Sequence, residues 1–93
     1  MTTENVQAIL DERGSRYGSF LDNARISHAL YKLIIIEDEN RTLMRKQEQL
    51  QPYQLEALKM ICHKIARILS GDPFYADNWD DIAGYAQLGK EPR

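Results

Sequence analysis

LEALKMICHKIARILSGDPFYADNWDDIAGYAQL, residues 55–88, is the stretch that decides the fold of this 93-residue chain. Its first part carries apolar residues at spacings of three and four, which is the period of an amphipathic helix. Pro52 suits the first turn of that helix, and Gly71 followed by Asp72 and Pro73 ends it. The repeating apolar positions are Leu55, Leu58, Ile61 or Cys62, Ile65, and Ile68 or Leu69.

The same stretch predicts a shorter helix after the loop. Asp77 is the expected N-cap and Gly89 the expected end, so that acidic residues lie at the positive end of the helix dipole. Gly84 predicts close approach to another helix, because an interior glycine costs about 1 kcal/mol relative to alanine. The expected inner face consists of Trp79, Ile82, Ala83 and Ala86.

The residues before Pro52 predict two further helices and a connector. Apolar side chains recur at helical spacing over residues 20–37, and Ser19 with Asp22 resembles a capping box. A strand over residues 33–36 is the alternative, but no second strand exists to pair with it. Residues 38–51 are charged and rich in amides, which predicts a mobile connector with one or two helical turns. A short helix is expected to precede this region and to end at Gly14.

The sequence therefore predicts one all-α domain over residues 1–93, a small helical bundle of three main helices plus a short N-terminal helix. A domain of this length buries only about 60–65% of the surface of its unfolded chain. The second half of the helix at residues 20–37 is apolar nearly all round. Both features predict a homodimer or a higher homo-oligomer.

The composition of the chain argues against nucleic-acid binding, membrane spanning and export. The chain has 14 acidic and 12 basic residues and a net charge of -2, so it has no overall attraction to nucleic acid or to an anionic membrane. Its longest apolar run, residues 33–36, is far shorter than a membrane helix. The polar N-terminus lacks a signal peptide, and a single cysteine, Cys62, excludes an intramolecular disulfide. The expected location is the cytoplasm.

Acidic residues gather around the start of the last helix. Asp77 and Asp81 are four residues apart, and like charges at that spacing repel unless a positive group lies nearby. Carboxylate oxygens are suited to magnesium, so Asp77, Asp80 and Asp81 are candidate Mg²⁺ ligands. The alternative is structural, with Asp77 and Asp80 at the helix start and Asp81 paired with Lys64 or Arg67 across the loop.

Basic residues follow one another along residues 55–70. They share a polar face that consists of Glu56, Lys59, His63 and Arg67 at helical spacing, with Lys64 beside them. This pattern describes either a solvated face or a contact of Lys64 and Arg67 with a phosphate or with the neighbouring acidic helix. The segment around Arg13, Arg16 and Tyr17 is a further candidate contact to an anion or a base. His28 and His63 lack partners at zinc-ligand spacing, and Cys62 is expected in the core. Motifs of known catalytic sites are absent.

A series of residues covers most of the chain outside the connector with a characteristic order and spacing. The series is Arg16-Tyr17-Gly18, Phe20, Asn23-Ala24, Ile26, Glu56-Ala57-Leu58, Met60-Ile61, Lys64-Ile65-Ala66-Arg67-Ile68, Gly71-Asp72-Pro73, Tyr75, Asp77, Trp79 and Asp81-Ile82-Ala83-Gly84-Tyr85-Ala86. In these residues the chain resembles a small phage and prophage family of helical proteins of unknown function.

A more distant resemblance rests on Tyr17-Gly18 near the start, on Lys64 and Arg67 in a Lys-x-x-Arg pattern, and on the run Asp81-Ile82-Ala83-Gly84-Tyr85-Ala86. In these motifs the chain is similar to MazG-like all-α nucleotide pyrophosphohydrolases, which hydrolyse nucleoside triphosphates with magnesium. Asp81 matches the aspartate of their Glu-x-x-Asp helix, whereas Asn78 stands at the glutamate position. This resemblance implies a nucleotide-associated protein in which Lys64 and Arg67 contact phosphates and Tyr17 or Tyr85 lines a base pocket. Asp77, Asp80 and Asp81 would hold the Mg²⁺ ion.

Two other functions fit the same sequence. The first is a non-enzymatic, phage-encoded factor that binds a host protein and modulates a defence or nuclease activity. The second is a structural homo-oligomer whose acidic and basic faces pair with each other. Only the nucleotide-associated interpretation would allow an enzyme, so whether the chain is an enzyme stays open, and binding to nucleic acid is not expected.

Overall fold

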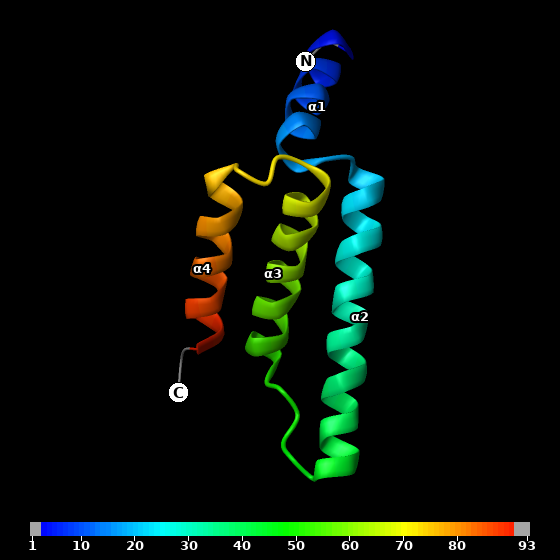
Figure 1. Cartoon of the computed structure of the whole chain (residues 1–93), viewed down its shortest axis with the longest axis vertical. Coiled ribbons are helices and arrows are strands. Elements are labelled where there is room, and N and C mark those ends of the chain that lie inside the picture. The colour runs from blue at the N-terminus through cyan, green and yellow to red at the C-terminus, as the bar shows by residue number, and fades with distance from the viewer. Residues whose placement is uncertain (1–2, 91–93) are drawn as a thin grey trace.

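The computed structural model describes residues 3–90, which form four α-helices and no strand (Figure 1). The helices are α1 (Thr3–Tyr17), α2 (Phe20–Arg45), α3 (Pro52–Ser70) and α4 (Ala76–Lys90). The predicted all-α class is therefore confirmed. The homo-oligomer stays a prediction, because the structure contains one chain.

The helix α3 is the centre of the arrangement. It packs against α4 on one side and α2 on the other, and more sparsely against α1. Figure 1 shows α4, α3 and α2 side by side, with α1 extending beyond the end of α3. The principal extents of 54 × 26 × 25 Å reflect this elongation. Because α2 and α4 do not close on each other, the three long helices form an open layer.

Few side chains are fully buried in this layer. Among residues 5–90, the buried apolar residues are Ala57, Cys62 and Ala66, all on α3. Cys62 is only 2% exposed, and burial raises the pKa of its thiol. A buried, protonated thiol behaves as a small apolar side chain, which agrees with the core position predicted for Cys62.

Three of the helix ends predicted from local sequence signals are confirmed. Ser19 is the N-cap of α2, and its side chain accepts a hydrogen bond from the Asp22 backbone N–H at 3.1 Å. Pro52 opens α3, and the N–H of Gly71 donates to the Arg67 carbonyl at its end. Each signal acts within one helical turn and is therefore readable from sequence.

Two helices are longer than expected. The first helix passes through Gly14 and ends at Tyr17. The second continues to Arg45, so the first half of the expected connector is helical. Asp38 explains this extension, because its Oδ1 lies 3.2 Å from Arg41 Nη2 and accepts a hydrogen bond from the Leu50 N–H at 3.0 Å. That contact fastens the loop 46–51 back onto the helix.

The helix α4 is rotated relative to the prediction. It begins at Ala76, so Asp77 lies inside its first turn and is not the N-cap. Trp79 is 54% exposed, whereas Asn78 is 1% exposed. Gly84 meets nothing within 4 Å, so the close approach predicted there is wrong. The close approach occurs instead at Gly89, where an added Cβ would lie 3.2 Å from the Ala57 Cβ.

Candidate functional site

Two glycines bring the start of the chain against the end of α3. Gly18, with φ of +80°, lies against the backbone of Ser70, and an added Cβ there would collide with the Ser70 carbonyl group. Gly71 is in a reciprocal position, since its added Cβ would lie 2.5 Å from the Arg16 carbonyl oxygen. The Asp72 N–H donates a hydrogen bond to that same oxygen at 3.0 Å. The backbones cross at this point because neither residue carries a side chain.

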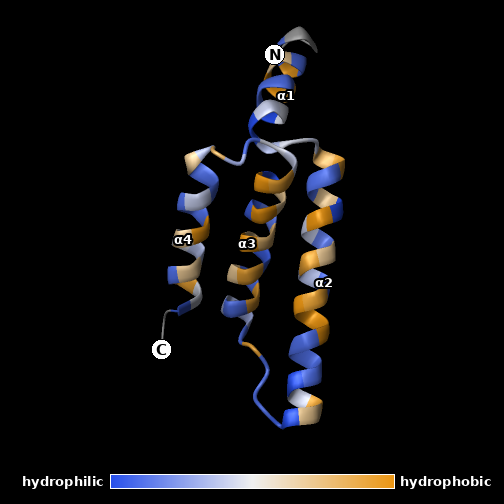
Figure 2. Ribbon diagram, viewed as in Figure 1, coloured by the Kyte–Doolittle hydropathy of each residue, from blue (hydrophilic) through white to orange (hydrophobic). Residues whose placement is uncertain are grey.

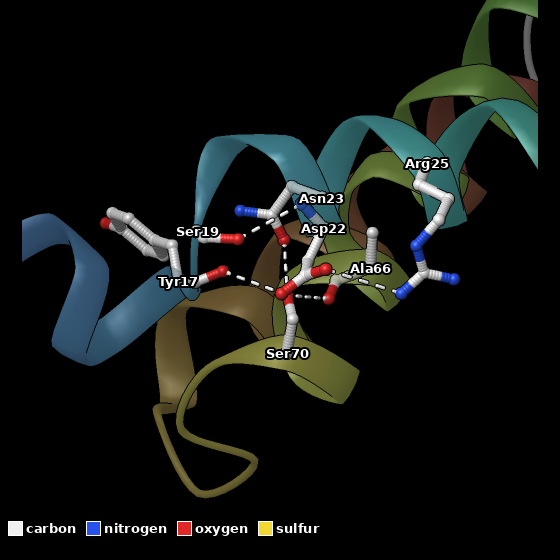
Figure 3. A network of polar contacts seen from close by, with 7 residues as sticks. All are labelled: Tyr17, Ser19, Asp22, Asn23, Arg25, Ala66 and Ser70. Carbon is white, nitrogen blue, oxygen red and sulfur yellow. Dashed lines mark hydrogen bonds and ion pairs between the residues drawn. The ribbon is translucent and has the colours of Figure 1, made fainter.

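A partly buried hydroxyl, that of Ser70, completes this junction (Figure 3). Ser70 Oγ lies 2.6 Å from Asn23 Oδ1, 2.8 Å from the Ala66 carbonyl oxygen and 3.4 Å from the Tyr17 carbonyl oxygen. Its single proton can serve one of these acceptors at a time. The hydroxyl therefore joins α2, α3 and the end of α1, and it fixes the position of Tyr17.

Arginine and tyrosine side chains gather beside the junction. The Arg67 Cζ lies 4.4 Å from the ring centroid of Tyr17, and the Arg13 Cζ lies 5.2 Å from the same centroid. Tyr17 meets Tyr75 edge to face at 5.6 Å, and the Arg16 guanidinium lies 5.3 Å from the Tyr75 ring. Guanidinium groups are attracted to the faces of aromatic rings, so each ring holds an arginine in place.

A cavity of about 430 Å³ lies next to this cluster, between α1, α2 and α3. This volume falls within the range of about 300–1,000 Å³ that is typical of small-molecule sites. The lining is Leu10, Arg13, Gly14, Tyr17, Gly18, Phe20, Asn23, Ala24, Ser27, His28, Tyr31, Lys59, His63 and Arg67. We call it the basic cavity, because it contains two arginines, one lysine and two histidines but no carboxylate.

The cationic groups of the basic cavity are not neutralised by acidic side chains. Among the residues whose side chains are described, Arg13, Lys59 and Arg67 form no ion pair with a carboxylate. Lys59 instead lies 5.8 Å from the centroid of the Tyr31 ring. Uncompensated positive charge in a concave site attracts anions, even though the chain as a whole has a net charge of -2.

The pKa of His63 is lowered by burial and, in part, by the same positive charges. Burial lowers its pKa, and the neighbouring Arg67, Lys64, His28 and Lys59 lower it further. Both causes disfavour the protonated form, so the imidazole is neutral near pH 7 in the ligand-free protein. A bound anion would oppose the field and favour the imidazolium.

The lowered pKa of His63 predicts a loss of stability in mild acid. The unfolded chain takes up a proton at His63 near the ordinary pKa of about 6.5, before the folded state does. The free energy of unfolding should therefore fall as the pH drops below that value, until His63 is protonated in the folded state as well. Urea denaturation between about pH 5 and pH 8 measures this dependence. His63→Gln should reduce it, and an unchanged dependence in that variant would contradict the assignment.

The residues predicted from sequence fall on two sides of α3. Arg67 and Tyr17 line the basic cavity. Lys64 does not line it, because it faces α4 and its Nζ lies 3.0 Å from Asp81 Oδ2. Tyr85 is half-buried on α4 and is also absent from the lining. The roles of Lys64 and Tyr85 in ligand binding stay predictions, while the pairing of Lys64 with Asp81 is observed.

Breaking this ion pair is expected to destabilise the fold. The Lys64 side chain is only 11% exposed, whereas that of Asp81 is 47% exposed. Asp81→Asn would leave a nearly buried ammonium without its partner, which should lower the unfolding free energy by about 1–2 kcal/mol. The neighbouring Asp80→Asn is the matched control and should change it by less than about 0.5 kcal/mol. Equal effects in chemical denaturation would show that the pair is not stabilising.

The three candidate magnesium ligands do not converge. Asp81 is engaged with Lys64, and Asp77 Oδ2 accepts a hydrogen bond from Tyr75 Oη at 2.9 Å, which raises the pKa of Tyr75. Asp80 is exposed. Within residues 3–90, no group of three histidine, cysteine or acidic side chains is placed to hold a metal ion. The described side chains thus do not form a preassembled magnesium site, and the Mg²⁺ assignment stays a prediction.

One buried group on α4 lacks a partner. The Asn78 side chain is 1% exposed, and neither its Nδ2 nor its Oδ1 has a hydrogen-bond partner among the described residues. It lies three residues before Asp81. It faces the interior of the layer, where sequence analysis placed Trp79.

Lys59, His63 and His28 were not assigned to a site from sequence. The spacing of Lys59, His63 and Arg67 did place them on one face of a helix, and that face does line the cavity. His28 and Tyr31 come from α2, and no local pattern links α2 to the basic residues of α3. Only the crossing of the helices brings them together.

No helix within residues 3–90 has the length and apolar content needed to cross a membrane. Neither a curated protein nor a solved structure matches the chain. One family model does match, over residues 2–93, and it is described as a domain of unknown function. With nearly its whole length covered, the chain belongs to this family, DUF6378.

Proposed function

We propose that this protein binds a nucleotide in the basic cavity. The single observation that carries the proposal is the composition of the lining, which combines five basic or imidazole side chains with three aromatic rings and contains no carboxylate. Phosphate requires cationic donors, and a base requires an aromatic or apolar surface. The cavity offers both within one volume.

The phosphate end of the ligand is assigned to Arg13 and Arg67. Both guanidinium groups lie over the Tyr17 ring, at 5.2 Å and 4.4 Å from its centroid, and neither has a carboxylate partner among the described side chains. Arginine binds phosphate oxygens through two parallel N–H bonds, and a guanidinium held against a ring loses less freedom on binding. The lining residue His63 can add a charged hydrogen bond once protonated.

The base is assigned to the end of the cavity at Tyr31. Lys59 and Arg67 are eight residues apart on α3, which corresponds to about 12 Å along the helix. The cavity is therefore long enough to separate the two ends of a nucleotide. Tyr31 provides a ring for stacking at that end. Phe20 lies 11 residues earlier on α2, at the Arg67 end, and is 83% exposed in the ligand-free chain. Ser27 supplies a polar side chain between the two ends.

The proposal concerns binding and does not include hydrolysis. The cavity lining contains no residue of α4, so Asp77, Asp80 and Asp81 do not line it. The pyrophosphohydrolase activity, the phage origin and the MazG-like classification rest on the resemblance in sequence alone. Magnesium can still reach the site as part of the ligand, bound to its phosphates.

A thermal-shift screen tests the proposal and identifies the ligand class. The purified protein is heated with nucleoside mono-, di- and triphosphates, with nucleosides, and with ribose 5-phosphate, each with and without magnesium. A ligand at a hundredfold excess over its dissociation constant should stabilise the fold by about 2.7 kcal/mol. We expect a shift with a nucleotide that exceeds the shifts with its nucleoside and with the sugar phosphate. No shift with any nucleotide would overturn the proposal and would favour the host-protein function.

A further inference from the structure

The layer formed by α2, α3 and α4 has two different faces. One face carries the basic cavity, to which α3 contributes Lys59, His63 and Arg67. At 100° per residue, Leu58, Ile65 and Leu69 lie on the opposite side of α3 from this group. Leu69 is 67% exposed, and Leu58 and Ile65 are half-buried. The side of α3 that faces away from the cavity is therefore apolar and incompletely covered.

The flanking helices continue this apolar surface. On α2, Ala24 and Tyr31 line the cavity, so Ile26 and Leu33 lie on the other flank of the helix. On α4, Asn78 is buried and Asp81 pairs with Lys64, so Trp79, Ala83 and Ala86 lie on the flank of α4 away from Asp81. We define the apolar face by these residues: Ile26, Leu30, Leu33, Leu58, Ile65, Leu69, Trp79, Ala83 and Ala86.

Figure 2 shows the same concentration of hydrophobic residues along α3 and in the middle of α2. Three large side chains of the apolar face, each from a different helix, are more than half exposed. They are Leu33 at 57%, Leu69 at 67% and Trp79 at 54%. An exposed apolar surface that runs across three helices is typical of an interface that is covered in the assembled protein.

The chain exposes more surface than a folded monomer of its mass, and the difference can be compared with the area that a dimer buries. The chain exposes 7043 Å² at a mass of 10.8 kDa. A folded monomer of that mass exposes about 5,500 Å². The excess is about 1,500 Å² per chain, or about 3,000 Å² for two chains, which falls in the range of obligate homodimers. The surplus is thus of the size that a second copy would bury.

We infer that a second copy of this chain packs against the apolar face, so that two open layers enclose one common core. A second copy is the partner that fits this face, because the surface that the chain exposes in excess of a folded monomer matches the area that a homodimer buries. In this dimer the two basic cavities lie on the outer surfaces. The dimer therefore does not depend on ligand binding.

Sedimentation velocity of paired variants tests this interface. The unmodified chain should sediment as a dimer, with twice the mass of 10.8 kDa. Leu33→Lys combined with Leu69→Lys places two charges in each apolar face and should give the mass of a monomer. Leu43→Lys is the matched control, since Leu43 is 78% exposed on α2 but lies away from the apolar face, and it should remain a dimer.

A monomeric unmodified chain at all concentrations would overturn the inference, as would a double variant that stays dimeric or a control that dissociates. The fluorescence of Trp79 keeps the inference testable if the double variant fails to fold. Trp79 is the single tryptophan, so the emission of the unmodified protein should shift to longer wavelength on dilution as this side chain becomes exposed to water. Emission that is independent of concentration across the dissociation measured by sedimentation would place the interface elsewhere.

Discussion

Arg67→Ala is expected to weaken nucleotide binding by about 100-fold. A hydrogen bond to a charged group contributes about 1.5–3 kcal/mol, and Arg67 can provide two such bonds to one phosphate. Its loss also removes the guanidinium that lies 4.4 Å from the Tyr17 ring centroid and lines the cavity. Isothermal titration calorimetry with the nucleotide found in the thermal-shift screen measures the change.

Two variants separate the role of Arg67 from a general loss of positive charge. Arg25→Ala removes an arginine from α2 whose side chain is 71% exposed and is paired with Asp22, so it should bind with unchanged affinity. Arg67→Lys keeps the charge but loses the planar fork, and its affinity should lie between those of the unmodified protein and Arg67→Ala. Unchanged affinity in a folded Arg67→Ala variant would exclude the basic cavity as the site.

Gly18→Ala is expected to lower the unfolding free energy by about 3 kcal/mol or more, since it combines an unfavourable φ with a collision between backbones. Gly18 has φ of +80°, and its added Cβ would collide with the Ser70 carbonyl. The obstructing atoms belong to the main chain, so no side-chain rotation relieves the contact. The link between α1 and α2 would have to move away from α3, and nucleotide binding should weaken with it.

Gly84→Ala makes the same chemical change where the surroundings are open. Gly84 lies in the interior of α4 and has nothing within 4 Å of an added Cβ. Alanine should therefore raise the unfolding free energy by up to about 1 kcal/mol through its higher helix propensity. Urea denaturation followed by circular dichroism compares the two variants. Effects of the same sign would show that the crossing of Gly18 and Gly71 is not a tight contact.

The basic cavity was predictable only in part. Arg67 was a candidate phosphate ligand because a helical period places it with Lys59 and His63 on one polar face. Arg13 and Tyr17 were noticed as a possible anion contact, but nothing in their own segment indicates that they meet Arg67. That contact depends on the crossing of Gly18 over Gly71, which joins residues far apart in the chain.

The rotation of α4 was predicted incorrectly for a related reason. Trp79, Ile82, Ala83 and Ala86 form an apolar flank, and an apolar flank usually faces the core of the same chain. In the structure the interior position belongs to Asn78, and Trp79 is 54% exposed. If a second copy covers the apolar face, this flank is buried in the assembly, which sequence patterning cannot distinguish from burial within one chain.

The sequence by itself determined that the chain is helical and where several helices begin or end. Ser19, Pro52 and Gly71 act on backbone groups within one turn, so their effect is independent of the rest of the fold. The tertiary structure alone decided which polar residues share a cavity, which pair with each other, and how far α2 extends. These outcomes depend on how helices cross, and crossings are set by contacts such as Gly18 with Ser70, Lys64 with Asp81, and Asp38 with Leu50.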